Sequence, residues 1–315
     1  MSLSCGIDIG GTKIAGGVVD ESGRILARLR AESPATDPEA IVDTVACLVD
    51  DLRAEHPVEH VGIGAAGFID AGRSTVLFAP NIAWRDQPLG RQLSERTGLP
   101  VVVENDANAA AWGEYVFGAG HGSATGDMLL VTVGTGVGGG IVADGELRRG
   151  AFGIAAEIGH LRLVHGGRLC GCGNHGCWEQ YASGSALVRE AKADAVGGSL
   201  LARPLLDRAG GDPSGITGPL ITELAQQGDP FCLEQLTELG HWLGEGVSSL
   251  VAVLDPGMVV VGGGVSAAGE LLLAPLRDRF AHTLSGRGFR PAPAILGAVL
   301  GNDAGMIGAA DLARR

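Results

Sequence analysis

Two segments of this sequence share one pattern, in which a short apolar strand leads into a glycine-rich turn and a second strand leads out. The first segment covers residues 4–20, with its turn at Gly10-Gly11-Thr12-Lys13. The second covers residues 128–144, with its turn at Gly134-Thr135-Gly136 and more glycines at 138–140. Repetition of a unit within one chain indicates a duplicated architecture. We therefore expect two related α/β halves.

The remaining sequence alternates predicted strands with predicted helices. Apolar residues recur at helical spacing from Pro38 to about Glu55, and further helices are expected at 89–97, 219–254 and 270–285. This alternation favours a largely parallel sheet in each half. A chain of 315 residues is also long for one hydrophobic core, which supports two domains.

A cluster of cysteines in the segment 157–179 predicts a metal site. Cys170, Cys172 and Cys177 fall within eight residues, and His160 precedes the first of them by ten. Three thiolates and one imidazole form a complete tetrahedral zinc set. Because three clustered thiols leave one unpaired in any disulfide scheme, a metal is the better interpretation.

Two other histidines, His165 and His175, are alternative fourth ligands. His175 is only two residues from Cys177, inside the loop, so the direction of its ring cannot be predicted. His160 is preferred because it has room to fold back onto the cysteines. The other three cysteines lie apart in apolar surroundings and are expected to be buried thiols: Cys5, Cys47 and Cys232.

The two glycine turns are candidate phosphate sites, because glycine lets backbone N–H groups approach phosphate oxygens. Asp8, before the first turn, could hold Mg²⁺ through water. The alternative for each turn is an ordinary hairpin. The second turn contains a formal Gly-x-Gly-x-x-Gly, but a strand follows where a dinucleotide-binding fold needs a helix. Together the turns could clamp a polyphosphate tail. Gly262-Gly263-Gly264 ends a strand and could meet a flat adenosine group, or serve only as a strand-to-helix turn.

Carboxylates supply the candidate catalytic and polyol-binding groups. Asp106 follows a buried strand, at the strand end where ligands collect, and could take a proton from a substrate hydroxyl. Asn105 could hold the neighbouring hydroxyl. The alternative for Asp106 is a helix N-cap. Glu157 and Glu179 flank the cysteine cluster and could bind a polyol, or could be solvated charges.

The composition excludes several classes of partner. A net charge of −13 argues against binding to a nucleic-acid backbone. No apolar run approaches the roughly 20 residues that span a bilayer, and the first residues do not resemble a signal peptide. We therefore expect a cytoplasmic protein.

Five motifs occur together and in one order, and as a set they resemble the ROK family of sugar kinases and repressors. Within that family the resemblance is greatest to bacterial glucokinases and covers essentially the whole chain. The cysteine pattern is highly specific, whereas the glycine turns are specific only in combination. The motifs are Asp8-Ile-Gly-Gly-Thr-Lys13, Glu104-Asn-Asp-Ala-Asn108, Gly134-Thr-Gly-x-Gly-Gly-Gly140, Glu157-x-Gly-His160 and Cys170-x-Cys-Gly-x-x-Gly-Cys-x-Glu179.

The resemblance implies a duplicated actin-like (ribonuclease H-like) ATPase fold of two α/β domains with a cleft between them. The C-terminal end would return to the first domain. Domain 1 would then comprise residues 1–108 and 302–315, and domain 2 residues 109–301.

The resemblance also implies transfer of the γ-phosphate of ATP to the 6-hydroxyl of glucose, the first step of glycolysis. Asp106 would be the base, and the other sugar hydroxyls would be held by Asn105, Glu157, His160 and Glu179. Phosphates would lie on the turns at 10–13 and 134–136, and adenosine on Gly262–Gly264. Mg²⁺ would assist. Zinc on His160, Cys170, Cys172 and Cys177 would be structural.

Several alternatives stay open at the sequence level. The substrate could be mannose, fructose, N-acetylmannosamine or N-acetylglucosamine, and the donor could be polyphosphate. The chain could also be a sugar-sensing regulator without catalysis, although the few residues before Asp8 leave no room for the helix-turn-helix of the family's repressors. The family resemblance suggests a homodimer or homotetramer.

Overall fold

The structure is a computed structural model that describes residues 2–80 and 82–315. Contacts divide it into two compact units. Unit 1 comprises residues 1–130, 140–156 and 299–315, and unit 2 comprises residues 131–139 and 157–298. The chain therefore passes from one unit to the other four times, after residues 130, 139, 156 and 298. The domain limits expected from the family resemblance stay a prediction.

Unit 1 contains a five-stranded sheet in the order β3-β2-β1-β4-β8. The pairs β1–β4 and β4–β8 are parallel, whereas β1–β2 and β2–β3 are antiparallel. The expectation of a largely parallel sheet thus holds for only half of these pairs, because a turn of a few residues can join only antiparallel strands. The strands are β1 (Leu3–Ile9), β2 (Lys13–Val19), β3 (Ile25–Glu32), β4 (Val58–Ala65) and β8 (Val101–Asn105).

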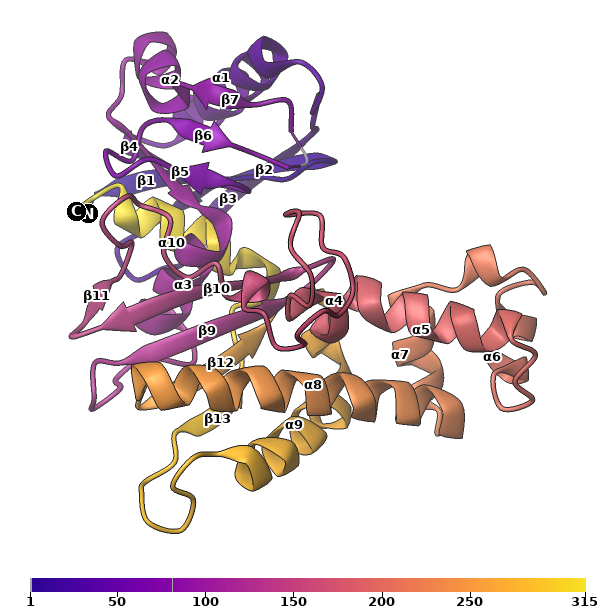
Figure 1. Cartoon of the computed structure of the whole chain (residues 1–315). Helices are drawn as coiled ribbons and strands as arrows, with labels where there is room; N and C mark the ends of the chain where they lie inside the picture. Colours follow the sequence, from indigo (N-terminus) through magenta and orange to yellow (C-terminus); the bar gives the residue numbers. More distant parts are fainter. Residues whose placement is uncertain (1, 81) are drawn as a thin grey trace. The chain divides into compact units, whose positions relative to one another are not determined.

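Helices cover both faces of this sheet (Figure 1). Helices α1 (Pro38–Glu55) and α2 (Leu89–Thr97) pack on one face, and α10 (Ala304–Leu312) and α3 (Asp106–Phe117) lie on the other. The start of α1 is set locally, because the Asp37 side chain accepts hydrogen bonds from two first-turn N–H groups and proline follows. A small antiparallel sheet of β5 (Phe68–Ile69), β6 (Val76–Phe78) and β7 (Arg85–Gln87) completes the unit.

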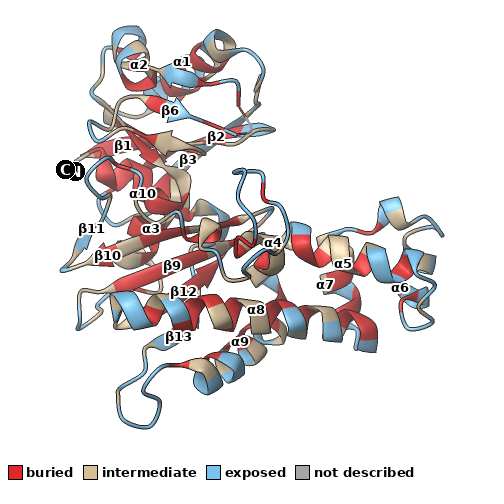
Figure 2. Cartoon of the chain, viewed as in Figure 1, coloured by how far each residue is buried: buried red, intermediate tan, exposed pale blue. Residues whose placement is uncertain are grey.

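The C-terminal helix α10 packs unusually closely on the first sheet and on α3. A Cβ built on Gly62 of β4 would lie 1.8 Å from the Ala309 carbonyl oxygen. A Cβ on Gly308 would lie 1.8 Å from the Ala109 carbonyl oxygen. Glycine at both positions is therefore a packing requirement. Most of α10 is buried (Figure 2).

The second five-stranded sheet has the order β11-β10-β9-β12-β13. Its strands are β9 (Met128–Val133), β10 (Val137–Ala143), β11 (Glu146–Leu147), β12 (Met258–Gly262) and β13 (Ala294–Gly297). The unit boundaries at residues 130 and 139 fall inside β9 and β10. The two expected strand–turn–strand segments are thus confirmed as β1–β2 and β9–β10.

Helices make up most of unit 2. The region 219–254, expected to be mainly helical, forms α7 (Gly218–Gln226) and α8 (Pro230–Leu254), and the Asp229 side chain caps α8. Helices α8 and α9 (Glu270–Thr283) lie side by side (Figure 1), with Gly240 and Gly244 at their closest approach. The remaining helices are α4 (Glu179–Ala182), α5 (Gly184–Val196) and α6 (Arg203–Arg208).

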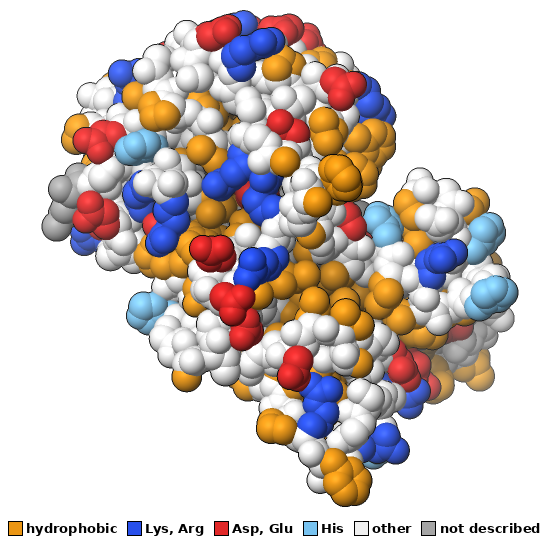
Figure 3. Space-filling model, turned by 60° about the vertical axis from the view of Figure 1, so that its left-hand side comes forward, with side chains coloured by type: hydrophobic (Ala, Val, Ile, Leu, Met, Phe, Trp, Pro, Cys, Tyr) orange, Lys and Arg blue, Asp and Glu red, His pale blue; other side chains and the backbone are white. Residues whose placement is uncertain are grey.

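The structure shows how exposed the isolated cysteines are, how charge is distributed on one face, and how long and apolar the helices are. Cys5 and Cys232 are buried as expected, but Cys47 is exposed, because it lies on the outward side of the amphipathic helix α1. On the face drawn in Figure 3, acidic side chains are interspersed with basic ones. Among the described residues, none of the helices is both long and apolar enough to cross a membrane.

Candidate active site and metal group

The end of β8 and the start of α3 place Asn105 and Asp106 next to each other in unit 1. Asn105, not Asp106, is the N-cap of α3, and its side-chain oxygen accepts a hydrogen bond from the Asn108 N–H at 3.0 Å. Its amide nitrogen donates to the Gly67 carbonyl oxygen at 3.1 Å. Asp106 is the first residue of the helix, and one of its oxygens accepts the Ala107 N–H at 2.9 Å. Capping therefore leaves the other Asp106 oxygen for another role.

Asp8 and Asp106 form an acidic pair at one end of the first sheet. In the strand register, Asp8 and Glu104 flank Gly64 of β4, and a Cβ on Gly64 would lie 3.8 Å from the Asp106 Cα. Burial, followed by the negative charge of Asp106, raises the pKa of Asp8 to about 6, and Lys13 acts in the opposite direction. Burial also raises the pKa of Asp106. Raised carboxylate pKa values are typical of sites that bind cations or transfer protons.

The turn between β1 and β2 presents backbone groups to solvent. The Gly10 N–H donates to the Lys13 carbonyl oxygen at 3.0 Å, which closes the turn. Gly10 and Gly11 are half-buried, whereas Thr12 and Lys13 are exposed. An exposed hydroxyl and ammonium beside glycines are suited to phosphate oxygens.

Four side chains of unit 2 form a group that could hold a metal ion: His160, Cys170, Cys172 and Cys177, whose ligand atoms all lie within 4.8 Å of one another. The His160 Nδ1 lies 3.6 Å from the Cys170 Sγ, so Nε2 is not the atom directed at the cysteines. Burial raises the pKa of the Cys170 thiol to about 12. A zinc ion would reverse that preference by stabilising the thiolate, and this donor set fits zinc.

The alternative ligands lie outside this group. The His175 Nδ1 is 3.0 Å from the Gly167 carbonyl oxygen, where it makes a local hydrogen bond. His165 is also absent from the group among the described residues. The backbone explains the gathering of the cysteines. Gly176, with φ of 79°, packs against Val164, whose carbonyl oxygen would meet a Cβ at 1.7 Å, and Cys177 forms an isolated antiparallel bridge with Arg162.

Glu179 follows the metal group and lies close to it. Its Oε1 accepts a hydrogen bond from the Cys170 Sγ at 3.0 Å and is 3.8 Å from the His160 Nδ1. A Cβ on Gly136 would lie 2.7 Å from Glu179 Oε2, so the second glycine turn also reaches this carboxylate. The fold therefore brings together a predicted phosphate turn and two predicted sugar-binding residues.

Glu157 begins the short 3₁₀ helix η1 (Ile158–His160), and its carbonyl oxygen accepts the His160 N–H at 3.1 Å. The preceding residue, Ala156, has φ of 68°, in the left-handed region. For a residue with a Cβ this conformation costs about 1–2 kcal/mol. Such strain is typical of segments whose conformation serves a site.

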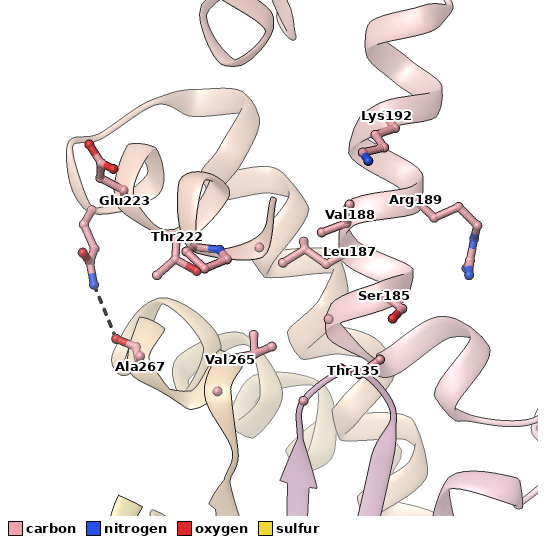
Figure 4. A pocket seen from close by; sticks show the side chains of 16 residues that line it. Thr135, Ser185, Leu187, Val188, Arg189, Lys192, Thr222, Glu223, Val265 and Ala267 are labelled. Atoms are coloured by element: carbon pink, nitrogen blue, oxygen red, sulfur yellow. Dashed lines mark hydrogen bonds between the residues drawn. The ribbon is translucent and has the colours of Figure 1, made fainter. Parts of the chain in front are cut away.

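A pocket of about 970 Å³ opens in unit 2 (Figure 4). The predicted phosphate residues Gly134 and Thr135 and the predicted adenosine residue Gly264 all line it. Gly262 and Gly263 do not. Gly263 instead has φ of 88°, and a Cβ there would lie 2.5 Å from the Val133 carbonyl oxygen, so it serves close packing between β12 and β9. The pocket has the size of a small-molecule site, and both apolar and charged side chains line it.

Most residues lining this pocket were not identified from the sequence. They come from α5, α7 and the 3₁₀ helix η3 (Gly264–Ala268), and include Ser185, Val188, Lys192, Pro219, Thr222 and Val265. Figure 4 labels Ser185, Val188, Lys192, Thr222 and Val265 around the opening. The α5 members recur at helical spacing, which marks one face of that helix. That signal does not distinguish a face that lines a pocket from one that packs in a core.

Sequence reasoning also missed a buried ionic group beside Asn105. Glu104 is completely buried, with one carboxylate oxygen 2.7 Å from Arg149 Nε and 3.4 Å from Arg73 Nε. The partners come from segments distant in the sequence, so no local pattern could have identified them.

Comparison with known proteins finds sugar kinases that are similar to this chain over its whole length. The model of the ROK family matches residues 4–315. A glucokinase of Streptomyces coelicolor is 52% identical over 314 residues, which covers 100% of this chain and 98% of that protein. The crystal structure of a ROK family glucokinase from Streptomyces griseus in complex with glucose and AMPPNP is 54% identical, with a TM-score of 0.90 over 99% of both chains. A ROK hexokinase from Thermus thermophilus is 37% identical, with a TM-score of 0.81 over 99% of this chain and 98% of that one.

The likeness extends over the whole chain in both sequence and structure, so the expected actin-like ATPase fold is confirmed. With a family match across residues 4–315 and relatives above half identity, this chain belongs to the ROK family.

Proposed function

We propose that this protein is a glucokinase, which transfers the γ-phosphate of ATP to the 6-hydroxyl of glucose. One structural observation carries the proposal: Asp106, a carboxylate with a raised pKa, stands at the end of a parallel strand beside a second carboxylate, Asp8. The similar glucokinase from Streptomyces griseus binds glucose and AMPPNP, which supports the same pair of substrate classes here.

In this mechanism Asp106 accepts the proton of the 6-hydroxyl as its oxygen attacks the γ-phosphorus in line with the leaving oxygen of ADP. Asn105, Glu157, His160 and Glu179 hold the other hydroxyls and so fix the attacking oxygen. The backbone N–H groups of the turns at 10–13 and 134–136 hold the phosphates. Positioning and charge stabilisation supply most of the catalysis in phosphoryl transfer, and the base contributes the proton transfer.

The pocket in unit 2 is proposed as the nucleoside site. Gly134 and Thr135 at its edge would lie near the phosphates, and Gly264 together with the apolar side chains of Val188 and Val265 would contact the adenosine. The apolar side chains suit a purine ring, and Arg189 and Lys192, which also line the pocket, suit anionic oxygens. An apolar surface for a base is needed by ATP and not by polyphosphate, so ATP is the proposed donor.

Two metal ions are part of the proposal. Asp8 would hold Mg²⁺ through water, and when bound the ion would neutralise charge that develops on the phosphates. Zinc would be held by His160, Cys170, Cys172 and Cys177. Four protein ligands fill its tetrahedral shell, so its role would be structural. Ligation through Nδ1 would fix the His160 ring and leave Nε2 for a sugar hydroxyl.

The alternative is a kinase for another hexose, which the similarity to a ROK hexokinase favours. A panel of glucose, mannose, fructose, N-acetylmannosamine and N-acetylglucosamine, assayed by ADP release with ATP and with polyphosphate as donors, separates these possibilities. We expect the highest kcat/KM for glucose with ATP. A clear preference for N-acetylmannosamine would overturn the assignment to glucose, and absence of ADP release with every sugar would favour a regulator.

The proposal extends to the setting of the reaction. A glucokinase would catalyse the first step of glycolysis in the cytoplasm, and we propose a homodimer or homotetramer. Sedimentation of the purified protein determines the oligomeric state.

A further inference from the structure

The carboxylate of Glu104 joins three segments of unit 1 that are distant in the sequence. Glu104 lies on β8, directly before Asn105 and Asp106. Arg73 lies in the turn between β5 and β6, and Arg149 follows β11. With 1% of its side chain exposed, Glu104 can be stabilised as an anion only by neighbours within the protein.

Each oxygen of this carboxylate has a separate set of contacts. Oε1 accepts the Asn105 N–H at 3.0 Å and the Asn108 side-chain amide at 3.2 Å, so it binds the first turn of α3. Oε2 forms the ion pairs with Arg149 at 2.7 Å and Arg73 at 3.4 Å. One buried group therefore holds the Asn105–Asp106 step on one side and two cations on the other.

The two arginines fix the other two segments to each other. Arg149 donates from Nη2 to the Asp70 carbonyl oxygen at 2.9 Å and from Nη1 to the Ala71 carbonyl oxygen at 3.1 Å. The Arg73 carbonyl oxygen accepts the Val103 N–H at 2.9 Å, which ties its turn to β8. A Cβ on Gly153 would lie 2.5 Å from the Ile69 carbonyl oxygen, so the segment after Arg149 also packs tightly on this turn.

Burial of this ionic group costs more free energy than burial of apolar side chains of the same volume. The carboxylate is desolvated, and the side chains of Arg149 and Arg73 keep only 14% and 26% of their surface exposed. A buried ion pair often contributes no net stability relative to hydrophobic residues. Surface ion pairs would not need this burial. The geometry instead suits a group that defines one position of the backbone at Asn105 and Asp106, since removal of Glu104 leaves two cations without their partner and removal of either arginine leaves the carboxylate with a single ion pair.

We propose that Glu104, with Arg149 and Arg73, positions Asp106 and Asn105 for the phosphoryl transfer, and that Glu104 is a positioning residue and not a catalytic one. This inference rests on the proposed role of Asp106 as the base. In the proposed reaction, a shift of Asp106 by a fraction of an ångström would lengthen the hydrogen bond to the attacking hydroxyl and lower the rate without abolishing nucleotide binding.

The test compares turnover with stability in four full-length variants. Glu104→Gln keeps an acceptor for the Asn105 N–H but leaves both arginines without a carboxylate. Arg149→Lys keeps the positive charge, but an ammonium group cannot reproduce the two guanidinium hydrogen bonds to the Asp70 and Ala71 carbonyl oxygens. The double variant Glu104→Gln/Arg149→Met removes one of the cations left unpaired. Asp311→Asn is the control. Like Glu104, Asp311 is a buried carboxylate that pairs with two arginines, Arg314 and Arg315. Its contact with α3 is at Trp112, six residues after Asp106, so it does not touch the Asn105–Asp106 step.

We expect Glu104→Gln to lower kcat by about 10- to 100-fold, with the KM for ATP changed by less than about twofold. Arg149→Lys should lower kcat in the same direction, and it remains informative if Glu104→Gln does not fold. Relative to Glu104→Gln, the double variant should have a higher melting temperature, because one unpaired cation is gone, but its kcat should stay as low. Asp311→Asn should lower the melting temperature with kcat within about twofold of the wild type. All rates are measured at least 15 °C below the lowest melting temperature, an interval of the order of the shift that a change of several kcal/mol produces.

Two outcomes overturn the inference: wild-type kcat in Glu104→Gln, or recovery of kcat together with melting temperature in the double variant, which would make the group purely structural. Asp106→Ala, assayed in parallel, separates this failure from failure of the proposed function. If Asp106→Ala retains turnover, Asp106 is not the base. If it loses turnover while Glu104→Gln does not, only the positioning role is wrong.

Discussion

At the scale of single residues, the proposed chemistry depends on where two acidic side chains lie. Asp106 and Asp8 stand at the end of the first sheet, and burial raises the pKa of both. The sequence predicted both as site residues: Asp106 because it follows a buried strand, and Asp8 because it precedes a glycine turn. It could not show that they interact, because Asp8 and Asp106 become neighbours only when β1, β4 and β8 pair.

The first prediction concerns Asp106. Replacing it by alanine removes the proposed base but leaves the sugar contacts, so kcat should fall by about two to four powers of ten while glucose still binds. Coupled ADP release gives kcat, and calorimetry gives the glucose Kd. The matched control is Asp144→Ala, because the Asp144 side chain is 84% exposed. Near-wild-type turnover in Asp106→Ala would contradict the assignment.

The second prediction concerns Asp8 and pH. Its pKa rises from 3.8 to about 6 on folding, so the folded state favours the protonated form. Stability from this group is therefore complete below about pH 4 and is lost as pH rises to about 6. In protein free of Mg²⁺ and nucleotide, Asp8→Asn should raise the melting temperature at pH 7.5, and the gain should shrink towards pH 4. Thermal scans across this range check it; a gain independent of pH would show that burial of the charge is not the cause.

At the scale of elements, the segment from Ile158 to Glu179 contains little regular secondary structure. It has one 3₁₀ turn, two isolated bridges and the first residue of α4. Its position depends on local contacts, of which the proposed zinc site would be the strongest. The three cysteines of the metal group could be predicted from spacing, because all four members of the group lie within 18 consecutive residues, 160–177, whereas the choice of His160 over His165 and His175 needed a further argument.

The third prediction follows from this dependence. Removal of zinc by a chelator, or Cys172→Ala, should lower the melting temperature and raise the glucose KM by at least about tenfold, because His160 and Glu179 lose their support. Cys47→Ala is the control, since Cys47 is exposed on α1 and far from the group in sequence. Metal-depleted protein that keeps both its melting temperature and its glucose KM would refute the coupling between metal and sugar site.

At the scale of the whole molecule, the chain closes on itself. Helix α10 begins about 300 residues after β1, yet it packs against β1, β4 and α3 in unit 1. The family resemblance predicted this return. The contact itself relies on glycines that let two backbones approach within van der Waals distance, an arrangement that a side chain would prevent.

The fourth prediction tests this approach. Gly308→Ala places a Cβ 1.8 Å from the Ala109 carbonyl oxygen and should destabilise the protein by about 1–3 kcal/mol. Gly305→Ala in the same helix meets its nearest atom at 3.8 Å, and should be neutral or stabilising by up to about 1 kcal/mol. Denaturant unfolding measures both. Equal effects of the two substitutions would show that the close approach does not limit stability.

The sequence by itself determined what depends on neighbours along the chain. Helix α1 begins and ends where predicted, because its cap, its proline and its apolar spacing are all local. The cysteine spacing likewise determined the metal group. Tertiary structure decided the rest: the ionic group of Glu104, Arg73 and Arg149, and the lining of the pocket in unit 2 by α5 and α7. The physical reason is that buried charge and pocket walls gain their free energy from contacts between distant segments, and these contacts exist only once the strands have paired and the helices have packed.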